Sequence, residues 1–204
     1  MAYSDPDIVF ALEAAHEAAK RILAIYGEPF EVDFKKGKEP VTRADRVADA
    51  FFVEAITRAF PRDALLTEEH GFIAPSQPHN GRVWFIDPID GTKEFIKKNG
   101  EFAIQIGLAM NGRLEKGLIL RPTSNDVFVA VQNKGCFLCP NDRPWERLRI
   151  PARASQGLIA AMSRSHPSSL GLKIGKQCGL TSVLERGSVG LKLMAIARGE
   201  AHFY

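Results

Sequence analysis

One stretch constrains this chain more than any other, because an apolar segment runs directly into two aspartates and then a helix start. Residues 83–86 are apolar and β-prone, which predicts a buried strand that ends at Asp87. Pro88 has no N–H for a ladder hydrogen bond, so we expect the strand to stop there. Asp87 and Asp90 can point the same way across this turn, and Gly91 can adopt whatever backbone angle the turn demands.

Thr92 follows as a candidate first residue of a helix, whose free N–H groups favour an anion. A strand end, two convergent carboxylates and a helix N-terminus together favour a hard divalent cation that faces a phosphate. The alternative is that Asp87 and Asp90 are ordinary turn residues, since aspartate is common in turns. The spacing alone leaves both interpretations open.

The order Asp-Pro-Ile-Asp-Gly-Thr at residues 87–92 resembles the signature of the inositol monophosphatase superfamily, the lithium-sensitive, magnesium-dependent phosphatases. The continuation, Lys-Glu-Phe-Ile at 93–96 and Lys-Asn-Gly-Glu-Phe at 98–102, is similar to that of the 3'(2'),5'-bisphosphate nucleotidases. Those enzymes remove the 3'-phosphate from 3'-phosphoadenosine 5'-phosphate. The resemblance implies the layered α/β/α/β sugar-phosphatase fold, of class α+β, and a cofactor of Mg²⁺.

The pattern along the chain independently predicts an α+β protein. Asp5 and Pro6 begin a helix that Gly27 ends, and a second helix follows Thr42 and stops before Pro61. A loop or hairpin connects the two helices. Residues 71–82 are rich in Gly, Pro, Ser and Asn and predict a surface loop.

The second half of the chain is dominated by predicted strands. Residues 102–138 predict an antiparallel meander with a tight Asn-Gly turn at 111–112, and 145–150 are a further strand candidate. The Pro-Ala-Arg-Ala-Ser connector at 151–155 suggests a lobe boundary. We therefore divide the chain into an N-terminal lobe with the metal site, 1–154, and the start of a C-terminal α/β lobe, 155–204, with a buried strand at 158–162 and an apolar helix at 191–197.

Asp45 has two interpretations. On physical grounds it is a first-turn carboxylate in a capping box that stabilises the helix dipole. Yet Val-Thr-x-Ala-Asp at 41–45 resembles the superfamily element whose aspartate pairs with a threonine to activate water. The resemblance implies that Asp45 and Thr92 are catalytic and take a proton from the attacking water. One residue can serve as both helix cap and catalytic group.

The same resemblance implies the metal and substrate ligands. Glu68, the first of two adjacent glutamates after the apolar run 64–66, would bind Mg²⁺ and take part in catalysis, with Glu69 behind it. Glu68, Asp87 and the Ile89 carbonyl would hold one Mg²⁺, and Asp87 and Asp90 would share a second. The implied substrate contacts are Glu68, Ile89, Asp90, Gly91, Thr92 and Ser188.

Two further segments are ambiguous. Ser-Arg-Ser-His at 163–166 also resembles the bisphosphate nucleotidases, but the nucleophile in that family is water, so His166 is either structural or faces the substrate. Lys35, Lys36 and Lys38 have the form of a solvated charge run, with a substrate contact from Lys36 as the alternative.

Composition restricts the class of protein. The 204 residues are 45% hydrophobic and 25% charged, values of a globular protein. No stretch approaches the ~20 apolar residues of a membrane span, and acidic residues interrupt any signal-like segment, so we expect a cytoplasmic protein. The net charge of +3 fits an anionic substrate, and no Lys/Arg run is dense enough to indicate nucleic acid.

The resemblance also bears on the end of the chain. In the superfamily the segment similar to 187–204 is followed by a Trp-Asp pair, whose aspartate completes the second metal site, and by a further helix. No residue here matches that aspartate, so we expect a truncated form that binds one Mg²⁺ better than two and turns over poorly. Uncovered apolar sheet surface and an open strand edge would favour a homodimer. Related phosphatases of inositol, histidinol or sugar phosphates, or a non-hydrolytic binding protein, are the competing functions.

Overall fold

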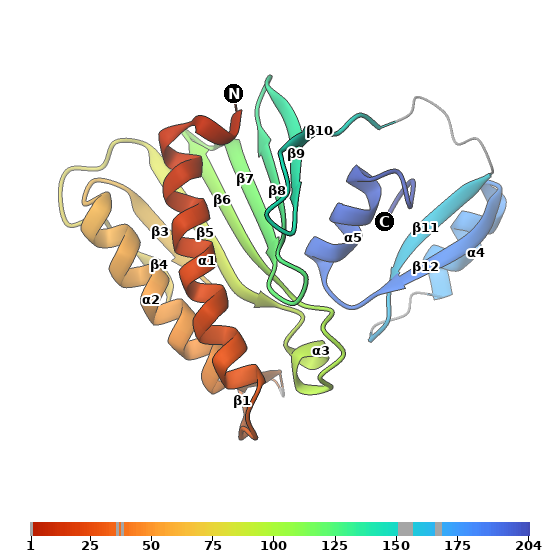
Figure 1. Cartoon of the computed structure of the whole chain (residues 1–204), viewed down its shortest axis with the longest axis horizontal. Helices are drawn as coiled ribbons and strands as arrows, with labels where there is room; N and C mark the ends of the chain where they lie inside the picture. The colour runs from red at the N-terminus through yellow and green to blue at the C-terminus, as the bar shows by residue number, and fades with distance from the viewer. Residues whose placement is uncertain (1, 36, 38, 151–156, 166–168) are drawn as a thin grey trace.

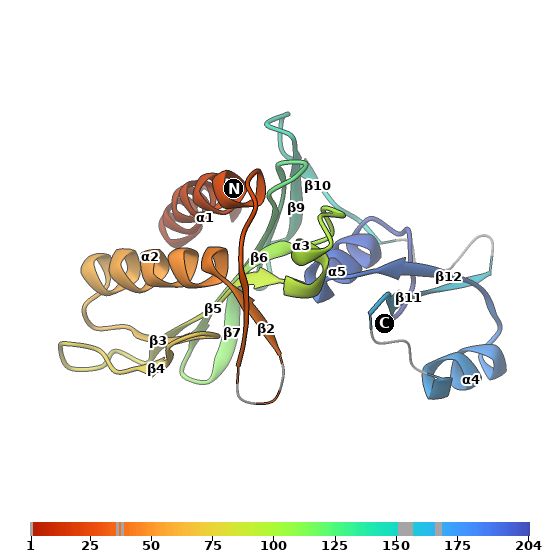
Figure 2. The ribbon, with the colours of Figure 1, turned by 90° about the horizontal axis from the view of Figure 1, so that it is seen from below.

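A computed structural model describes residues 2–35, 37, 39–150, 157–165 and 169–204. Two long helices, α1 (Pro6–Tyr26) and α2 (Arg43–Ala59), lie side by side over one face of a large sheet (Figures 1 and 2). A short 3-10 turn, η1 (Ala2–Ser4), precedes α1. The hairpin of β1 (Val32–Phe34) and β2 (Pro40–Thr42) connects the two helices.

The large sheet has eight strands in the order β10-β9-β8-β7-β6-β5-β3-β4. Neighbouring strands are antiparallel, except that β3 and β5 are parallel. The strand bounds are β3 (Ala64–Thr67), β4 (Gly71–Ile73), β5 (Arg82–Asp90), β6 (Ala103–Met110), β7 (Arg113–Arg121), β8 (Asp126–Val131), β9 (Gly135–Pro140) and β10 (Glu146–Arg147). The α+β class and the meander are thus confirmed.

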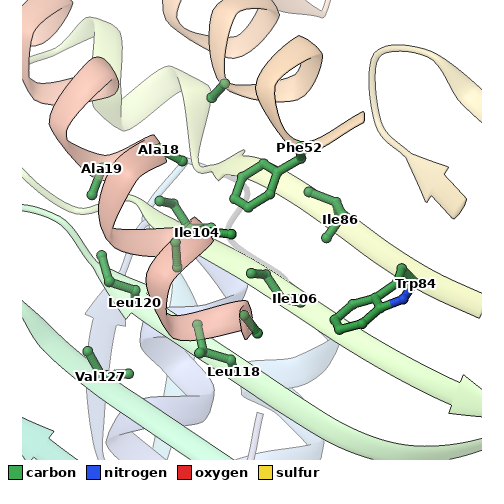
Figure 3. Packing of buried hydrophobic residues seen from close by; sticks show 14 of the residues in the cluster. Ala18, Ala19, Phe52, Trp84, Ile86, Ile104, Ile106, Leu118, Leu120 and Val127 are labelled. Carbon is green, nitrogen blue, oxygen red and sulfur yellow. The ribbon is translucent and has the colours of Figure 1, made fainter. Parts of the chain in front are cut away.

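Both faces of the sheet carry apolar side chains, because residues alternate between the faces along each strand. One face packs against α1 and α2, where Phe52 of α2 lies beside Ile86 and Ile104 of the sheet (Figure 3). On the opposite face, Ala103, Phe128 and Leu138 pack against Leu191 and Met194 of α5 (Val189–Ala197). Helices therefore cover parts of both faces, which gives the layered architecture.

The C-terminal part forms a second, smaller unit of structure. β11 (Leu158–Ser163) and β12 (Leu180–Arg186) pair in parallel, with α4 (Ser169–Gln177) as the crossover between them. Phe203 adds a parallel bridge to Ala160, and α5 contacts both this sheet and the large sheet. The predicted lobe boundary falls on the connector 151–155, which lies outside the described residues.

The starts of α1 and α2 were predicted correctly, whereas α5 begins at Val189, two residues before the predicted start. Asp5 caps α1 by accepting a hydrogen bond from the Asp7 backbone N–H at 3.1 Å, and Pro6 is the first helical residue. Thr42 and Asp45 form the predicted capping box of α2. These features depend on a few adjacent residues, so the local sequence suffices to specify them.

Three predictions about elements need correction, and one helix was missed. β5 does not stop before Pro88 but continues to Asp90, because the pairing with β6 shifts register between Asp87 and Asp90 and leaves the proline outside the ladder. The predicted loop 71–82 begins with an edge strand, β4, and the strand candidate 145–150 shrinks to β10. Helix α4 was not predicted, because two glycines, Gly171 and Gly175, weaken its helical pattern.

Candidate active site

Glu68 and Asp87 lie together because they follow neighbouring parallel strands. Thr67 of β3 pairs with Ile86 of β5, so the two acidic residues come next at the same edge of the sheet. The Glu68 backbone N–H continues the pairing by donating to the Ile86 carbonyl at 3.2 Å. Parallel pairing between distant segments therefore brings the predicted ligands of one metal to adjacent positions.

The bulge between residues 87 and 90 orients the remaining ligand candidates. Asp87 Oδ1 accepts a hydrogen bond from the Ile89 N–H at 3.1 Å, as in an Asx turn. The Asp90 carboxylate turns to the N-terminus of α5, where Oδ2 accepts from the Gly190 N–H at 2.6 Å and from the Ser188 hydroxyl. Ser188 also caps α5 by accepting from the Leu191 N–H. The bulge and the α5 cap are thus one connected structure.

The electrostatics at Asp87 favour a cation. Burial, followed by the negative charges of Glu68 and Asp90, raises the pKa of Asp87 to about 9. A divalent cation would relieve both effects, since it replaces lost hydration and neutralises the repulsion. The candidate metal-ligand atoms are all oxygen atoms. Mg²⁺ prefers oxygen ligands, and a set made only of oxygen atoms argues against zinc. The residues present therefore fit Mg²⁺.

Two of the three carboxylates are engaged with other partners. Lys35 Nζ lies 2.9 Å from Glu68 Oε1 and 2.6 Å from Glu69 Oε1, and both carboxylates raise the pKa of Lys35 against the opposing effect of burial. Asp90 bonds to the start of α5. Among the residues that the structure describes, no three His, Cys, Asp or Glu side chains converge as a complete metal site. Glu68 and Asp87 are adjacent, Lys35 occupies Oε1 of Glu68, and Asp90 has one oxygen, Oδ1, outside its bonds to α5.

Asp45 and Thr92 form the predicted pair. Thr92 Oγ1 donates to Asp45 Oδ1 at 3.1 Å, and the other oxygen, Oδ2, accepts from the Thr42 N–H at 2.8 Å and from its hydroxyl at 2.6 Å. Burial raises the pKa of Asp45, while the hydrogen bonds from Thr42 and Thr92 lower it in part. Both interpretations of Asp45 are compatible, since one oxygen caps α2 and the other contacts Thr92.

The predicted site residues other than Asp45 and Ser188 line a cleft of about 690 Å³ between the large sheet and the C-terminal unit. The near wall contains most of the predicted site residues, namely Glu68, Asp87, Ile89, Asp90, Gly91 and Thr92. The far wall is formed by residues of β11, α5 and the chain end, such as Met162, Lys192 and Tyr204. Ser188, a predicted substrate contact, is buried and does not line the cleft, but its hydroxyl donates to Asp90. His166 and Lys36 lie outside the described residues.

Two lysines matter that the sequence reasoning missed. Lys192 is 1% exposed, and its Nζ lies over the Tyr204 ring and 3.5 Å from the Gly187 carbonyl oxygen. Burial lowers the pKa of Lys192, although Asp90, Glu101 and Glu94 oppose this effect. Lys192 is a charged residue inside the apolar segment 189–197, and this was the signal in the sequence that could have identified it. Lys35 was expected to be part of a solvated charge run, but it contacts both Glu68 and Glu69.

Comparison with known proteins identifies relatives of this chain. Residues 4–204 match the inositol monophosphatase family. The chain is 30% identical over 194 residues to the 3'(2'),5'-bisphosphate nucleotidase CysQ of Salmonella typhimurium, a match that covers 94% of this chain and 77% of that protein. It is 36% identical over 134 residues to a histidinol-phosphatase of Chlorobaculum parvum, which covers 65% of this chain and 51% of that protein.

Solved structures share this fold. The solved structure of the extragenic suppressor protein SuhB from Bartonella henselae superposes with a TM-score of 0.81 at 27% identity, covering 98% of this chain and 78% of that one. The sequence match over nearly the whole chain and the shared fold lead to one conclusion. This chain belongs to the inositol monophosphatase family.

Proposed function

We propose that this protein is a Mg²⁺-dependent phosphatase that hydrolyses the 3'-phosphate of 3'-phosphoadenosine 5'-phosphate to give AMP and phosphate. The family and the relatives support a phosphatase, and the similarity to CysQ supports this substrate. One observation carries the proposal. Glu68, Asp87 and Asp90 line the same cleft as Thr92, whose hydroxyl is hydrogen-bonded to the buried Asp45.

In this proposal Glu68, Asp87 and the Ile89 carbonyl hold one Mg²⁺, and Asp87 and Asp90 hold a second. Mg²⁺ neutralises phosphate charge and makes a nearby water a better nucleophile. Lys35 must release Glu68 when that carboxylate becomes a ligand. Asp90 has a second lone-pair-bearing oxygen, Oδ1, that its hydrogen bonds to α5 do not use.

The protein's own contribution to proton transfer is the pair formed by Thr92 and Asp45. As water attacks phosphorus, its proton passes to Thr92 Oγ1 while the threonine proton moves to Asp45 Oδ1, across a contact of 3.1 Å. The bond from phosphorus to the ribose oxygen breaks, and that oxygen keeps the electron pair and takes a proton from solvent. The hydrogen bonds from Thr42 keep Asp45 aimed at Thr92 throughout.

Substrate binding would use both walls of the cleft. The backbone N–H groups of Gly91 and Thr92, at the start of the short helix α3 (Thr92–Ile96), would face the transferred phosphate. Lys192 on the far wall is a cation near Asp90, and Ser188 holds Asp90 in place. We propose that Lys192 contacts an anionic group of the substrate, which a nucleoside bisphosphate would provide.

A second candidate substrate is histidinol phosphate, because the Chlorobaculum parvum relative carries the name histidinol-phosphatase at 36% identity. Inositol 1-phosphate and fructose bisphosphate are further family-type substrates. Binding without hydrolysis is the remaining alternative. It predicts that the protein takes up Mg²⁺ and nucleotide but releases no phosphate.

The test is phosphate release from each of these substrates at equal concentration, with Mg²⁺ and with EDTA. We expect the highest kcat/KM for 3'-phosphoadenosine 5'-phosphate, loss of activity in EDTA, and inhibition by lithium ions. A clear preference for inositol 1-phosphate or histidinol phosphate would overturn the nucleotide assignment. Nucleotide binding with no phosphate release from any substrate would overturn the phosphatase assignment.

A further inference from the structure

Two glutamates next to the active site have no part in the mechanism above. Glu94 lies in α3 and is 1% exposed, and Glu101 follows in the loop before β6 with 14% of its side chain exposed. Both carboxylates face the C-terminal part of the chain. A carboxylate that is this well buried must have compensating partners, and for each of these two some of the partners lie in the turns beside the far wall of the cleft.

Glu94 contacts both turns that border the far wall. Its carboxylate accepts from the Ser165 hydroxyl, in the turn after β11, and from Asn99 Nδ2 at 2.5 Å. Burial would raise the pKa of Glu94, but these donors, with Lys97 and Arg164, lower it, so the group is charged. A Cβ on Gly187 would lie 2.1 Å from Glu94 Cγ, so the turn before α5 fits against Glu94 only because residue 187 is glycine.

Glu101 engages the same two turns. Arg164, next to Ser165, holds the carboxylate with a fork of two hydrogen bonds, Nε to Oε2 and Nη2 to Oε1, both at 3.0 Å. The Gly187 N–H donates to Oε2 at 2.9 Å. Paired N–H donors of this kind fix orientation as well as distance. Glu101 is therefore a fixed joint between the loop after α3 and two separate turns of the C-terminal part.

These turns carry the far wall of the cleft. The turn at 164–165 follows directly from β11, whose residues 160–163 line the cleft. The turn at 187–188 begins α5, which carries Lys192 into the cleft. Displacement of either turn would move the far wall, whereas the near wall stays fixed by the parallel pairing of β3 with β5.

We propose that Glu94 and Glu101 form an interlobe clamp that positions the far wall and thereby determines which leaving group the enzyme accepts. The inference rests on the proposed phosphatase function and names Glu94 and Glu101 as the residues that control its substrate specificity. A nucleoside 3'-phosphate is large enough to contact both walls, so its binding depends on the clamp. A compact aryl phosphate needs only the near wall, so it is indifferent to the clamp.

The test uses Glu101→Gln and Arg164→Gln, with Glu54→Gln as the control, because Glu54 pairs with Arg58 in an exposed contact on α2. Steady-state kinetics are measured with 3'-phosphoadenosine 5'-phosphate and with para-nitrophenyl phosphate. We expect each clamp variant to raise KM for the nucleotide about tenfold, with kcat and both constants for the aryl phosphate changed less than about twofold. The double variant with Glu101→Gln and Arg164→Gln should resemble the more impaired single variant, since each change removes the same contact between these two side chains.

Hydrogen exchange separates the clamp from the proposed function. The amides of residues 187–191 should exchange faster in both clamp variants and remain unchanged in Glu54→Gln, whatever the enzyme hydrolyses. Equal losses for both substrates, or unchanged kinetics for both, would overturn the specificity role, and unchanged exchange would overturn the clamp itself. A wild-type protein that hydrolyses neither substrate would refute the proposed function, while the exchange result would still decide the clamp.

Discussion

At the scale of single residues, the pKa of Asp87 has a measurable consequence. Burial and the charges of Glu68 and Asp90 raise this pKa to about 9, so Mg²⁺ must displace a proton to bind at neutral pH. We expect about one proton to be released per ion near pH 7 and none above about pH 10. Calorimetry in buffers of different ionisation enthalpy measures this number directly.

The same carboxyl links metal binding to stability. Its folded pKa lies above the ordinary value of 3.8, so without Mg²⁺ the folded protein loses stability as the pH rises toward about 9. Mg²⁺ should therefore raise Tm more at pH 9 than at pH 6. Asp87→Asn, which carries no titrating group, should release no proton and show a smaller increase in Tm. Binding without proton release in the wild type near neutral pH would contradict the assignment.

Asp45 allows the cap and the catalytic role to be separated. In Asp45→Asn the side chain can still accept hydrogen bonds from Thr42, but it is a far weaker base toward Thr92. We expect kcat to fall by ~10²- to 10⁴-fold, with the Mg²⁺ affinity changed less than about twofold. Thr92→Ser, which keeps the hydroxyl, is the matched control and should retain most activity. A large loss of Mg²⁺ affinity in Asp45→Asn would instead place this residue among the metal ligands.

The positions of candidate site residues relative to one another were predictable from sequence where the chain itself keeps the residues together. Asp87, Asp90 and Thr92 lie within one short motif, and the sequence motif around Asp45 is equally local. The partners of Glu68 and Asp90 were not predictable, because Lys35 reaches its glutamates through a hairpin and Ser188 reaches Asp90 across almost a hundred residues of chain. Such contacts depend on tertiary packing, which periodicity and spacing do not encode.

At the scale of elements, Gly91 should be the most sensitive position of the bulge. Its φ of +104° is unfavourable for other residues, and a Cβ there would lie 3.0 Å from the Glu101 carbonyl oxygen. We expect Gly91→Ala to destabilise the fold by ~1–3 kcal/mol and to misplace α3, with loss of activity. Urea denaturation and the kinetic assay measure the two effects.

Gly112 is the matched control, since its φ is +77° but a Cβ there would meet nothing within 4 Å. Gly112→Ala should cost only the backbone strain and leave kcat unchanged. Equal destabilisation and equal activity in the two variants would show that the close approach of Glu101 has no effect on the site.

Elements were predicted best where local signals specify them. Caps at Asp5 and Thr42 and the turn at Asn111 and Gly112 follow from adjacent residues, and the structure has all three. The bulge through Pro88 was not predicted, because it requires pairing with β6 on one side and contact with α5 on the other. β4 was not predicted either, since its existence depends on Leu66 pairing with Phe72 at the edge of the sheet.

At the scale of the whole molecule, one face of the sheet is only partly covered. Beside α5, a second groove of about 770 Å³ is lined by apolar residues that include Phe85, Leu114 and Leu193. These three side chains are 41%, 65% and 43% exposed. Exposed apolar patches of this kind mark interaction surfaces in soluble proteins.

Among the helices that the structure describes, none combines the length and the apolar character that a membrane-spanning helix needs.

We expect this face to mediate a homodimer. Leu114→Lys should shift the protein toward monomer in sedimentation velocity, because it places a charge in the apolar groove. Phe34→Lys, at a 68% exposed apolar side chain of β1, is the control and should leave the oligomeric state unchanged. A wild-type protein that is monomeric at all accessible concentrations would contradict the expectation.

The layered fold itself was predictable because the central motif resembles a family with that fold, and because helices and strands segregate along the chain. The sequence did not predict which surfaces of the elements face each other. The parallel pairing of β3 and β5, and the position of α5 against both sheets, create the cleft between two walls. The candidate site residues of the near wall were therefore predictable from the sequence, whereas most residues of the far wall were not.

We infer that Glu68, Asp87 and Asp90 bind the Mg²⁺ that phosphate release requires. The most direct measurement is release of phosphate from 3'-phosphoadenosine 5'-phosphate as Mg²⁺ is titrated, for the wild type, Asp87→Asn and Asp90→Asn. We predict that the wild type is active only with Mg²⁺, and that each variant needs at least about tenfold more Mg²⁺ for half-maximal rate or shows no activity, because a charged ligand becomes neutral. Activity in EDTA, or identical Mg²⁺ curves for all three proteins, would contradict the claim.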